Sequence, residues 1–324
     1  MEMKEAIKNF NQQFEYEPEI ENARQSRHFN KFIVVGMGGS RLAADLLKVW
    51  NPYLDVVIHK DYGLPALSDQ DLKERFVILS SYSGNTEEVI DAFNKAIEKK
   101  LACAVVSIGG KLIELAKKHN QPYIKLPDTG IQARLALGFS FRALLKLMGE
   151  DKALQETRKL AQSLKPADFE KVGLALAKRL QGFTPVIYSS LQNLPIACNW
   201  KINFNETGGI PAFYNAFPEL NHNEMAGFDA KLETKNLSAH FCFILLQDAS
   251  DHSRIKKRME VFKQLYGKRN FTIESVKLDG KDVFYKIFSS LVLAGWTAYY
   301  IAQARGIETD QVPVVEEFKK LIAK

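Results

Sequence analysis

Short apolar runs alternate along the first half of the chain with longer segments in which apolar residues recur at helical spacing. The runs at residues 32–35 and 76–79 are rich in β-branched residues and end in glycine or serine. Segments with helical spacing follow them at about 42–49 and 86–99. Three more strands are expected at residues 56–58, 104–106 and 123–124. Buried strands separated by helices indicate a parallel α/β sheet.

The same alternation begins again beyond a helix expected at about 134–148 and the charged residues 149–152. In this half, strands are expected at 185–188, 241–246 and 271–276, and helices at about 194–205, 253–266, 283–304 and 314–322. The pattern therefore predicts two α/β units in tandem. The first covers residues 1–150 with an N-terminal helical segment, and the second covers residues 151–324.

The composition of the 324 residues, with 46% hydrophobic and 25% charged residues, is that of an ordinary globular protein. The sequence has no run of about 18 apolar residues, so we expect no membrane span. The net charge of +6 comes from scattered basic residues, which does not indicate nucleic-acid binding. Cys103, Cys198 and Cys242 are widely spaced and odd in number, so we expect neither a disulfide framework nor a zinc site, and a reducing cytoplasm fits best.

The sequence GMGGS, residues 36–40, follows the first strand and opens a helix. Gly38 and Gly39 allow a ligand to approach the backbone, the helix amides attract an anion, and Ser40 adds a hydroxyl. A dinucleotide site is disfavoured because Arg41 stands where the third glycine of that motif belongs, although Asp61 lies about where a ribose-binding acid would. A tight turn without a ligand stays an alternative.

The sequence SYSGNTEE, residues 81–88, follows the third strand. Ser81, Ser83 and Thr86 offer three hydroxyls, which together with helix amides suit a phosphate dianion. A structural interpretation competes, in which Asn85 caps the helix and Glu88 completes a capping box. The cap does not explain the serines at the strand end, so we favour phosphate binding.

GMGGS and SYSGNTEE, together with QARLALG, WKINFNE and ELNHNE, resemble the bifunctional phosphoglucose/phosphomannose isomerases, a family of sugar isomerase (SIS) domain proteins. The resemblance covers roughly residues 25–324. It implies two tandem SIS subdomains with flavodoxin-like parallel sheets flanked by helices, a homodimer, and no metal or nucleotide cofactor. It also implies that Gly38, Gly39, Ser40, Ser81, Ser83 and Thr86 bind the sugar phosphate.

Three catalytic roles are implied by the resemblance. Glu206 would be the base that moves a proton between C2 and C1 of the sugar, and Arg134 would stabilise negative charge on the substrate oxygens. His222 would assist ring opening and reach the site from the partner subunit. Apart from the resemblance, a helix-end carboxylate, a fixed cation and a histidine in a polar loop suit these tasks. An ordinary surface or structural residue remains the alternative for each.

The resemblance weakens near the C-terminus. A lysine of the family would fall at about Gln303 or Ala304, where none is present, and Gly306 begins an eroded version of a further family motif. Thr297 is expected to match a small hydroxyl residue that faces the substrate.

We therefore predict an aldose–ketose isomerase that interconverts glucose 6-phosphate, and mannose 6-phosphate, with fructose 6-phosphate. The alternative is a non-catalytic or differently specific SIS-domain protein that binds a sugar phosphate. Glu206 and His222 favour the enzyme, because a sensor needs neither.

Overall fold

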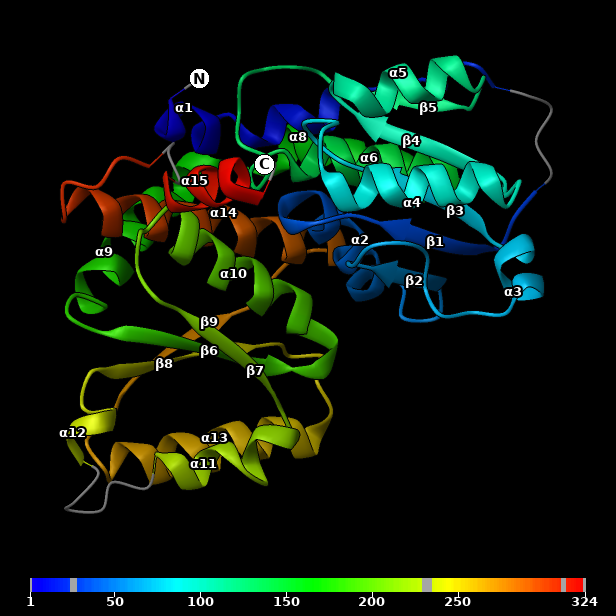
Figure 1. The fold of residues 1–324 in the computed structure, drawn as a ribbon. Helices are drawn as coiled ribbons and strands as arrows, with labels where there is room; N and C mark the ends of the chain where they lie inside the picture. The colour runs from blue at the N-terminus through cyan, green and yellow to red at the C-terminus, as the bar shows by residue number, and fades with distance from the viewer. Residues whose placement is uncertain (1, 24–27, 229–234, 310–312, 323–324) are drawn as a thin grey trace. The chain divides into compact units, whose positions relative to one another are not determined.

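The chain folds into two compact α/β units, each with its own parallel sheet (Figure 1). The computed structural model describes residues 2–23, 28–228, 235–309 and 313–322. The first unit runs from residue 8 to residue 165, and the second comprises residues 2–7 and the chain from 166 onward. Residues 151–165, which the predicted division at 150/151 assigned to the second part, thus lie in the first compact unit.

The sheet of the first unit has the strand order β2-β1-β3-β4-β5, and its pairs are all parallel. Its strands are β1 (Lys31–Val35), β2 (Asp55–His59), β3 (Phe76–Ser80), β4 (Cys103–Ser107) and β5 (Tyr123–Lys125). The five strands predicted from the apolar runs are confirmed to within one residue. The order is that of flavodoxin-like sheets.

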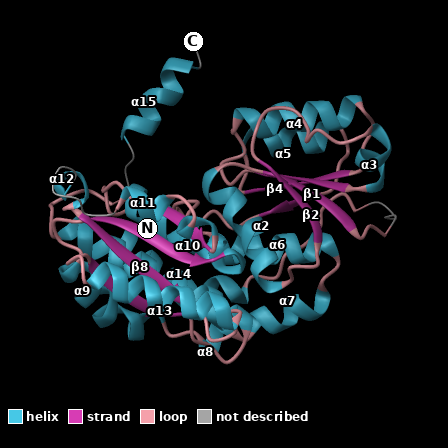
Figure 2. Ribbon diagram, turned by 90° about the horizontal axis from the view of Figure 1, so that it is seen from below, coloured by secondary structure: helices cyan, strands magenta, loops and turns pink. Residues whose placement is uncertain are grey.

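Helices cover both faces of this sheet (Figure 2). One face packs against α3, α4 and α5, and the other against α2 and α6. In α4 the buried residues Val89, Ala92, Phe93 and Ala96 form one stripe at helical spacing, which is why this segment lies on the sheet. The helices of the unit are α2 (Gly38–Trp50), α3 (Asp69–Glu74), α4 (Glu87–Glu98), α5 (Gly110–Lys118), α6 (Leu137–Met148), α7 (Asp151–Arg158), α8 (Leu160–Ser163) and the 3₁₀ helix η1 (Phe10–Glu15).

The sheet of the second unit has the order β7-β6-β8-β9, which repeats the first four positions of the other sheet. Its strands are β6 (Thr184–Ser190), β7 (Phe213–Phe217), β8 (Phe241–Gln247) and β9 (Thr272–Lys277). Three were predicted, and β7 was missed. It is an edge strand in which Phe213 and Tyr214 are exposed and Asn215 is half-buried, so its sequence does not read as an apolar run.

An aromatic cluster joins one face of the second sheet to α13, while α10 and α14 cover the other face (Figure 1). The cluster includes Tyr188, Phe217, Phe243, Phe262 and Tyr266. The elements of this unit are α1 (Met3–Lys8), η2 (Pro166–Phe169), α9 (Glu170–Arg179), η3 (Leu191–Asn193), α10 (Leu194–Glu206), η4 (Glu219–Asn221), α11 (Glu224–Gly227), α12 (Lys235–Ser238), α13 (Ser253–Gly267), α14 (Val283–Gln303) and α15 (Pro313–Ile322). In the described part of the chain, no helix has both the length and the apolarity to cross a membrane.

Candidate active site

Two glycine- and serine-rich loops leave the first sheet at the same edge. β1 ends at Val35 and β3 ends at Ser80, and the two strands pair directly in parallel. The loop after β1 opens α2, and the loop after β3 opens α4. Because the strand order reverses between β1 and β3, this edge is the crevice in which α/β sheets bind their ligands.

One serine hydroxyl joins the two loops, and a second lies within the loop after β3. The backbone N–H of Tyr82 donates to Ser40 Oγ at 2.7 Å, and that of Asn85 donates to Ser83 Oγ at 3.3 Å. A serine hydroxyl has one proton in addition to its acceptor lone pairs. Ser40 and Ser83 are acceptors in these bonds, so each retains a proton that it can donate to a ligand.

Ser81 and Thr86 share a single hydrogen bond. Their hydroxyl oxygens lie 2.8 Å apart and either can be the donor, while the backbone N–H of Gly84 donates to Ser81 Oγ at 3.1 Å. One proton of the pair is used between them, and the other remains. Together with Ser40 and Ser83, the crevice thus presents three hydroxyl donors and no charged group among these four residues.

The competing interpretation, a capping box of Asn85 and Glu88, is wrong. The residue that caps α4 is Thr86 by position, and its side chain makes no capping hydrogen bond. The Asn85 side chain turns to the start of α5, where its Oδ1 accepts from the backbone N–H of Lys111 at 3.1 Å. Its Nδ2 donates to Ser83 O of its own loop at 3.3 Å. The first amides of α4 are therefore without a side-chain cap, which favours an anion at this end of the helix.

Glycine is required at two positions of these loops. Gly84 has a φ of +74°, and a Cβ there would lie 1.9 Å from Gly109 O. A Cβ on Gly39 would lie 2.7 Å from the carbonyl carbon of Ala133 and 2.8 Å from the backbone nitrogen of Arg134. Gly39 therefore allows the segment that contains Arg134 to pack directly against the start of α2.

Arg134, at about which we predicted the helix to begin, lies in a turn three residues before the observed start of α6. The backbone N–H of Leu135 donates to Gln132 O at 2.8 Å, and α6 begins at Leu137. The side chain of Gln13, which lies far away in the sequence, accepts from the N–H of Gly138 at 2.9 Å. It thereby satisfies one of the free amides in the first turn of α6. The Arg134 side chain is buried.

Glu206 is the last residue of α10 and is half-buried. The helix ends there because Asn203 O accepts from the backbone N–H groups of both Thr207 and Gly208, at 2.9 and 3.0 Å. Gly209 then adopts a φ of +61°, in the left-handed region that ends many helices. The carboxylate thus lies at the carbonyl end of a helix, as predicted.

His222 follows η4 at the carboxyl end of β7, and its side chain is exposed. We expected His222 to lie in a polar loop. Phe217 ends β7, and both Phe217 and Leu220 are fully buried in the aromatic cluster. The two buried side chains pack the loop against the sheet, and His222 lies on the solvent-exposed side of the loop.

Thr297 lies within α14 and is fully buried, and its hydroxyl donates to Leu293 O of the same helix at 2.8 Å. A contact between Thr297 and a substrate stays a prediction. Gln303 ends α14, and Ala304 and Arg305 follow it; all three are exposed. Ala304 and Arg305 line a cavity of about 300 Å³ with the end of α9.

The predicted site residues thus fall into two sets. The predicted phosphate-binding residues and Arg134 belong to the first unit, where packing at Gly39 brings the Arg134 segment to the loops. Glu206, Thr297 and His222 belong to the second unit and come from α10, α14 and the loop after β7.

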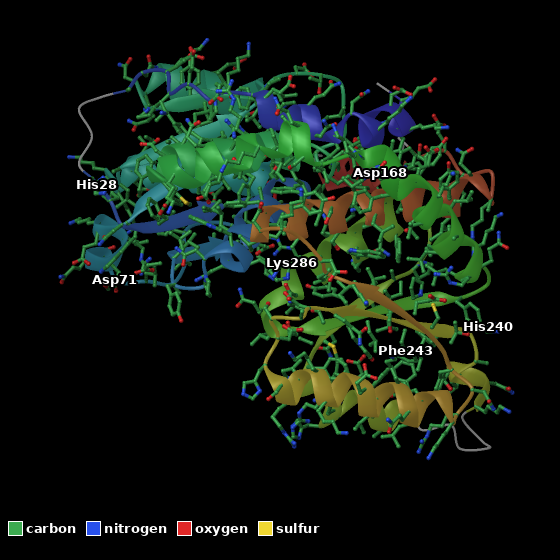
Figure 3. The ribbon with its side chains drawn as sticks, turned by 180° about the vertical axis from the view of Figure 1, so that it is seen from behind. His28, Asp71, Asp168, His240, Phe243 and Lys286 are labelled. Atoms are coloured by element: carbon green, nitrogen blue, oxygen red, sulfur yellow. The ribbon has the colours of Figure 1, made fainter. Side chains whose placement is uncertain are left out.

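A buried polar cluster that the sequence did not predict lies at the carboxyl edge of the second sheet. Lys286, at the start of α14 (Figure 3), donates to Asp248 Oδ2 at 2.6 Å. Asn193 Nδ2 is within hydrogen-bonding distance of Ser190 Oγ (3.1 Å), Asp248 Oδ2 (3.0 Å) and Asp251 Oδ1 (3.4 Å). No local motif signals it, because its members come from the end of β6, η3, the loop after β8 and the start of α14.

The two aspartates of this cluster respond oppositely to their surroundings. Burial alone would raise the pKa of Asp248, but hydrogen bonds from Lys286 and Ser250 outweigh it and the pKa is lowered. Burial raises the pKa of Asp251. Among the residues that the structure describes, no group of three or more His, Cys, Asp and Glu side chains is arranged to hold a metal ion.

Comparisons with known proteins agree with this architecture. Residues 169–322 match the family model described as the bacterial phospho-glucose isomerase C-terminal SIS domain. The crystal structure of a glucosamine-6-phosphate deaminase from Thermotoga maritima superposes with a TM-score of 0.66 at 14% identity, covering 96% of each chain. The predicted tandem SIS architecture is thus confirmed.

Two curated relatives match over nearly their whole length. A bifunctional phosphoglucose/phosphomannose isomerase from Caldicellulosiruptor bescii is 32% identical over 317 residues, which are 93% of this chain and 91% of the relative. The protein of the same name from Aquifex aeolicus is 30% identical over 329 residues, covering 100% of this chain and 99% of the relative.

Proposed function

Because the chain belongs to the bifunctional phosphoglucose/phosphomannose isomerase family and is a sugar-phosphate isomerase, we propose that it interconverts glucose 6-phosphate and mannose 6-phosphate with fructose 6-phosphate. The reaction moves one hydrogen between neighbouring carbons of one substrate. It therefore needs a base and charge stabilisation rather than a redox cofactor.

The observation that carries the proposal is the crevice between β1 and β3. Its three available hydroxyl donors, from Ser40, Ser83 and the pair Ser81 and Thr86, complement the acceptor oxygens of a phosphate. The first amides of α4, which have no side-chain cap, add positive dipole ends. The backbone at Gly38, where a Cβ would meet nothing within 4 Å, leaves room for the phosphate to approach.

Glu206 is the proposed base. In the open-chain aldose its carboxylate takes the proton from C2, the electrons move to the carbonyl oxygen at C1, and a cis-enediolate forms. A proton then passes from the hydroxyl on C2 to the oxygen on C1, the protonated Glu206 returns its proton to C1, and the carbonyl forms at C2, which gives the ketose. Glu206 is half-buried at the last residue of α10, and a positioned carboxylate is a suitable group to move a proton between neighbouring carbons.

Arg134 and His222 complete the proposed site. The guanidinium of Arg134 is a permanent cation that would stabilise the negative oxygens of the enediolate. The exposed imidazole of His222 would transfer protons during ring opening, in the site of a partner subunit within a homodimer. The Thr297 hydroxyl donates to Leu293 O and would accept a hydrogen bond from the substrate. We also propose a cytoplasmic location.

The test of the proposal is a coupled assay with fructose 6-phosphate on the wild type and on Glu206→Gln. The variant keeps the shape of the side chain but removes the base, so kcat should fall by about 10²–10⁴-fold while phosphosugar binding, measured by calorimetry, persists. Glu260→Gln, on the exposed side of α13, is the control and should keep wild-type activity.

Other outcomes would decide against parts of the proposal. Equal activity of Glu206→Gln and the wild type would exclude Glu206 as the base. Binding without turnover in the wild type, across glucose, mannose, fructose and glucosamine 6-phosphates, would favour a sugar-phosphate sensor. Mixed dimers of His222→Ala and Glu206→Gln subunits should regain activity, and no recovery in confirmed mixed dimers would exclude a shared site.

A further inference from the structure

In the loop that contains His222 the histidine is exposed, and the residues on either side of it hold the loop in place. Asn223 Nδ2 donates to Glu219 Oε1 at 2.9 Å, within the loop. Asn221 Oδ1 accepts from Arg258 Nη1 of α13 at 3.0 Å. The loop is thus anchored on the residue directly before His222, and the polar neighbours of the histidine have structural partners.

Glu224 anchors the loop on the other side of His222. One oxygen of its carboxylate accepts from the hydroxyl of Tyr188 in β6, and the other accepts from Nδ2 of Asn215 in β7. Tyr188 and Asn215 are direct partners in the parallel register of the two strands. The carboxylate therefore bridges neighbouring strands, and only a side chain with two acceptor oxygens satisfies both donors.

The two donors are themselves held in place. Asn215 Oδ1 accepts from the backbone N–H of Ala216 at 2.8 Å, which directs its Nδ2 toward Glu224. The ring of Tyr188 packs edge-on against Phe217 and lies 5.5 Å from Phe243, whose side chain is in the aromatic layer between the sheet and α13 (Figure 3). Burial, and then the bond to Glu224, raises the pKa of Tyr188, so the phenol stays a donor.

We propose that Glu224 is a positioning residue for His222. By bridging Tyr188 and Asn215, it fixes the loop two residues beyond the histidine and so sets the direction in which the imidazole leaves the sheet. This inference rests on the role proposed above for His222 in ring opening. Its consequence is that part of the catalytic geometry is determined by two strands that do not touch the substrate.

The test combines Glu224→Ala with His222→Ala in a double-mutant cycle. Glu224→Ala should lower kcat about 10–100-fold with KM within threefold, because the histidine is misplaced while phosphate binding is unchanged. The double variant should be no slower than His222→Ala alone, because Glu224 acts only through His222. Glu224→Gln, which keeps a two-pronged side chain, should recover part of the activity.

Glu170→Ala is the matched control. Glu170 accepts a hydrogen bond from Tyr300 at 2.6 Å in the same unit, so the variant also removes a Tyr–Glu bond but leaves the His222 loop untouched. It should keep wild-type kcat. Hydrogen exchange of the amides at residues 219–226 should accelerate at least tenfold in Glu224→Ala and remain unchanged in Glu170→Ala.

The outcomes separate this inference from the proposed function. Unchanged kcat in Glu224→Ala, or losses that add fully to those of His222→Ala, would overturn the positioning role. If the wild type has no isomerase activity, the proposed function fails, and unchanged loop exchange in Glu224→Ala would overturn the anchoring independently. Should Glu224→Ala not fold, Tyr188→Phe removes one donor, keeps the ring, and should show the same non-additivity.

Discussion

The two units present the same crevice with opposite chemistry. In each, the strand order reverses beside the first strand, between β1 and β3 in one sheet and between β6 and β8 in the other. The first crevice has hydroxyls that can still donate, and Ser83 at its rim is exposed. The second has two aspartates that are held by Asn193 and Lys286 and are buried.

This difference shows that topology offers a place for a ligand, and side chains decide whether it is used. An anion entering the second crevice would meet two carboxylates, and the lysine that could attract it is already paired with Asp248. The first crevice has neutral donors, which need no counter-charge before they bind phosphate. The fold is repeated, whereas the proposed phosphate site is present once.

The largest effect is expected from Lys286→Met. It leaves Asp248, 5% exposed, without its charged partner, and breaking a buried pair from one side costs about 3–5 kcal/mol of unfolding free energy. Urea denaturation measures the loss. Lys286→Met combined with Asp248→Asn should recover most of it, and a single variant as stable as the wild type would contradict an ion pair that stabilises the second crevice.

A second variant would make the first crevice resemble the second. Ser83→Asp places a carboxylate where the phosphate is proposed to bind, and like charges should raise KM for fructose 6-phosphate about 100-fold or more. Ser83→Asn, of similar size but neutral, should raise KM far less. Equal KM values for the two variants would mean that charge does not distinguish the crevices.

A smaller effect is expected when one donor is removed. Ser83→Ala takes one hydroxyl from the phosphate and should raise KM about tenfold with little change in kcat, because a hydrogen bond to a charged group contributes about 1.5–3 kcal/mol. Ser68→Ala is the control. Its hydroxyl caps α3 by accepting from Asp71 N at 3.1 Å, so stability should fall while KM stays constant. An unchanged KM in Ser83→Ala would remove Ser83 from the site.

The smallest effect concerns pH. Burial, with the charge of Asp248 adding to it, holds the folded pKa of Asp251 above its unfolded value of about 3.9. Such a group contributes stability that is complete below the unfolded pKa and is lost as the pH rises through the folded pKa. The stability of the wild type relative to Asp251→Asn should therefore fall as the pH rises above about 4. A difference independent of pH, in urea denaturation from pH 4 to 7, would contradict the raised pKa.

Asp248 works in the opposite direction within the same cluster. Its lowered folded pKa contributes stability above the unfolded value, which is lost as the pH falls through the folded pKa. The comparison with Asp251→Asn measures the contribution of Asp251 together with its interaction with Asp248, because Asp248 and Lys286 are present in both proteins.

The sequence predicted eight of the nine strands, since strand formation here follows from short, local apolar runs. It failed at β7, where Asn215 and exposed aromatic residues at a sheet edge hide the strand. It also failed at Asn85. A capping box can be recognised locally, but the first turn of α5, whose Lys111 N–H donates to the asparagine side chain, comes 26 residues later.

The chain by itself determined the alternation of strands and helices, the glycines at the two loops and the hydroxyls beside them, because periodicity and turn chemistry act over a few residues. Tertiary structure alone decided which hydroxyls keep a proton to donate, that the second crevice is filled by a lysine and two aspartates, and that Glu224 anchors the loop of His222. Those outcomes depend on strand order and register, which bring together side chains such as Tyr188 and Glu224 from separate parts of the chain.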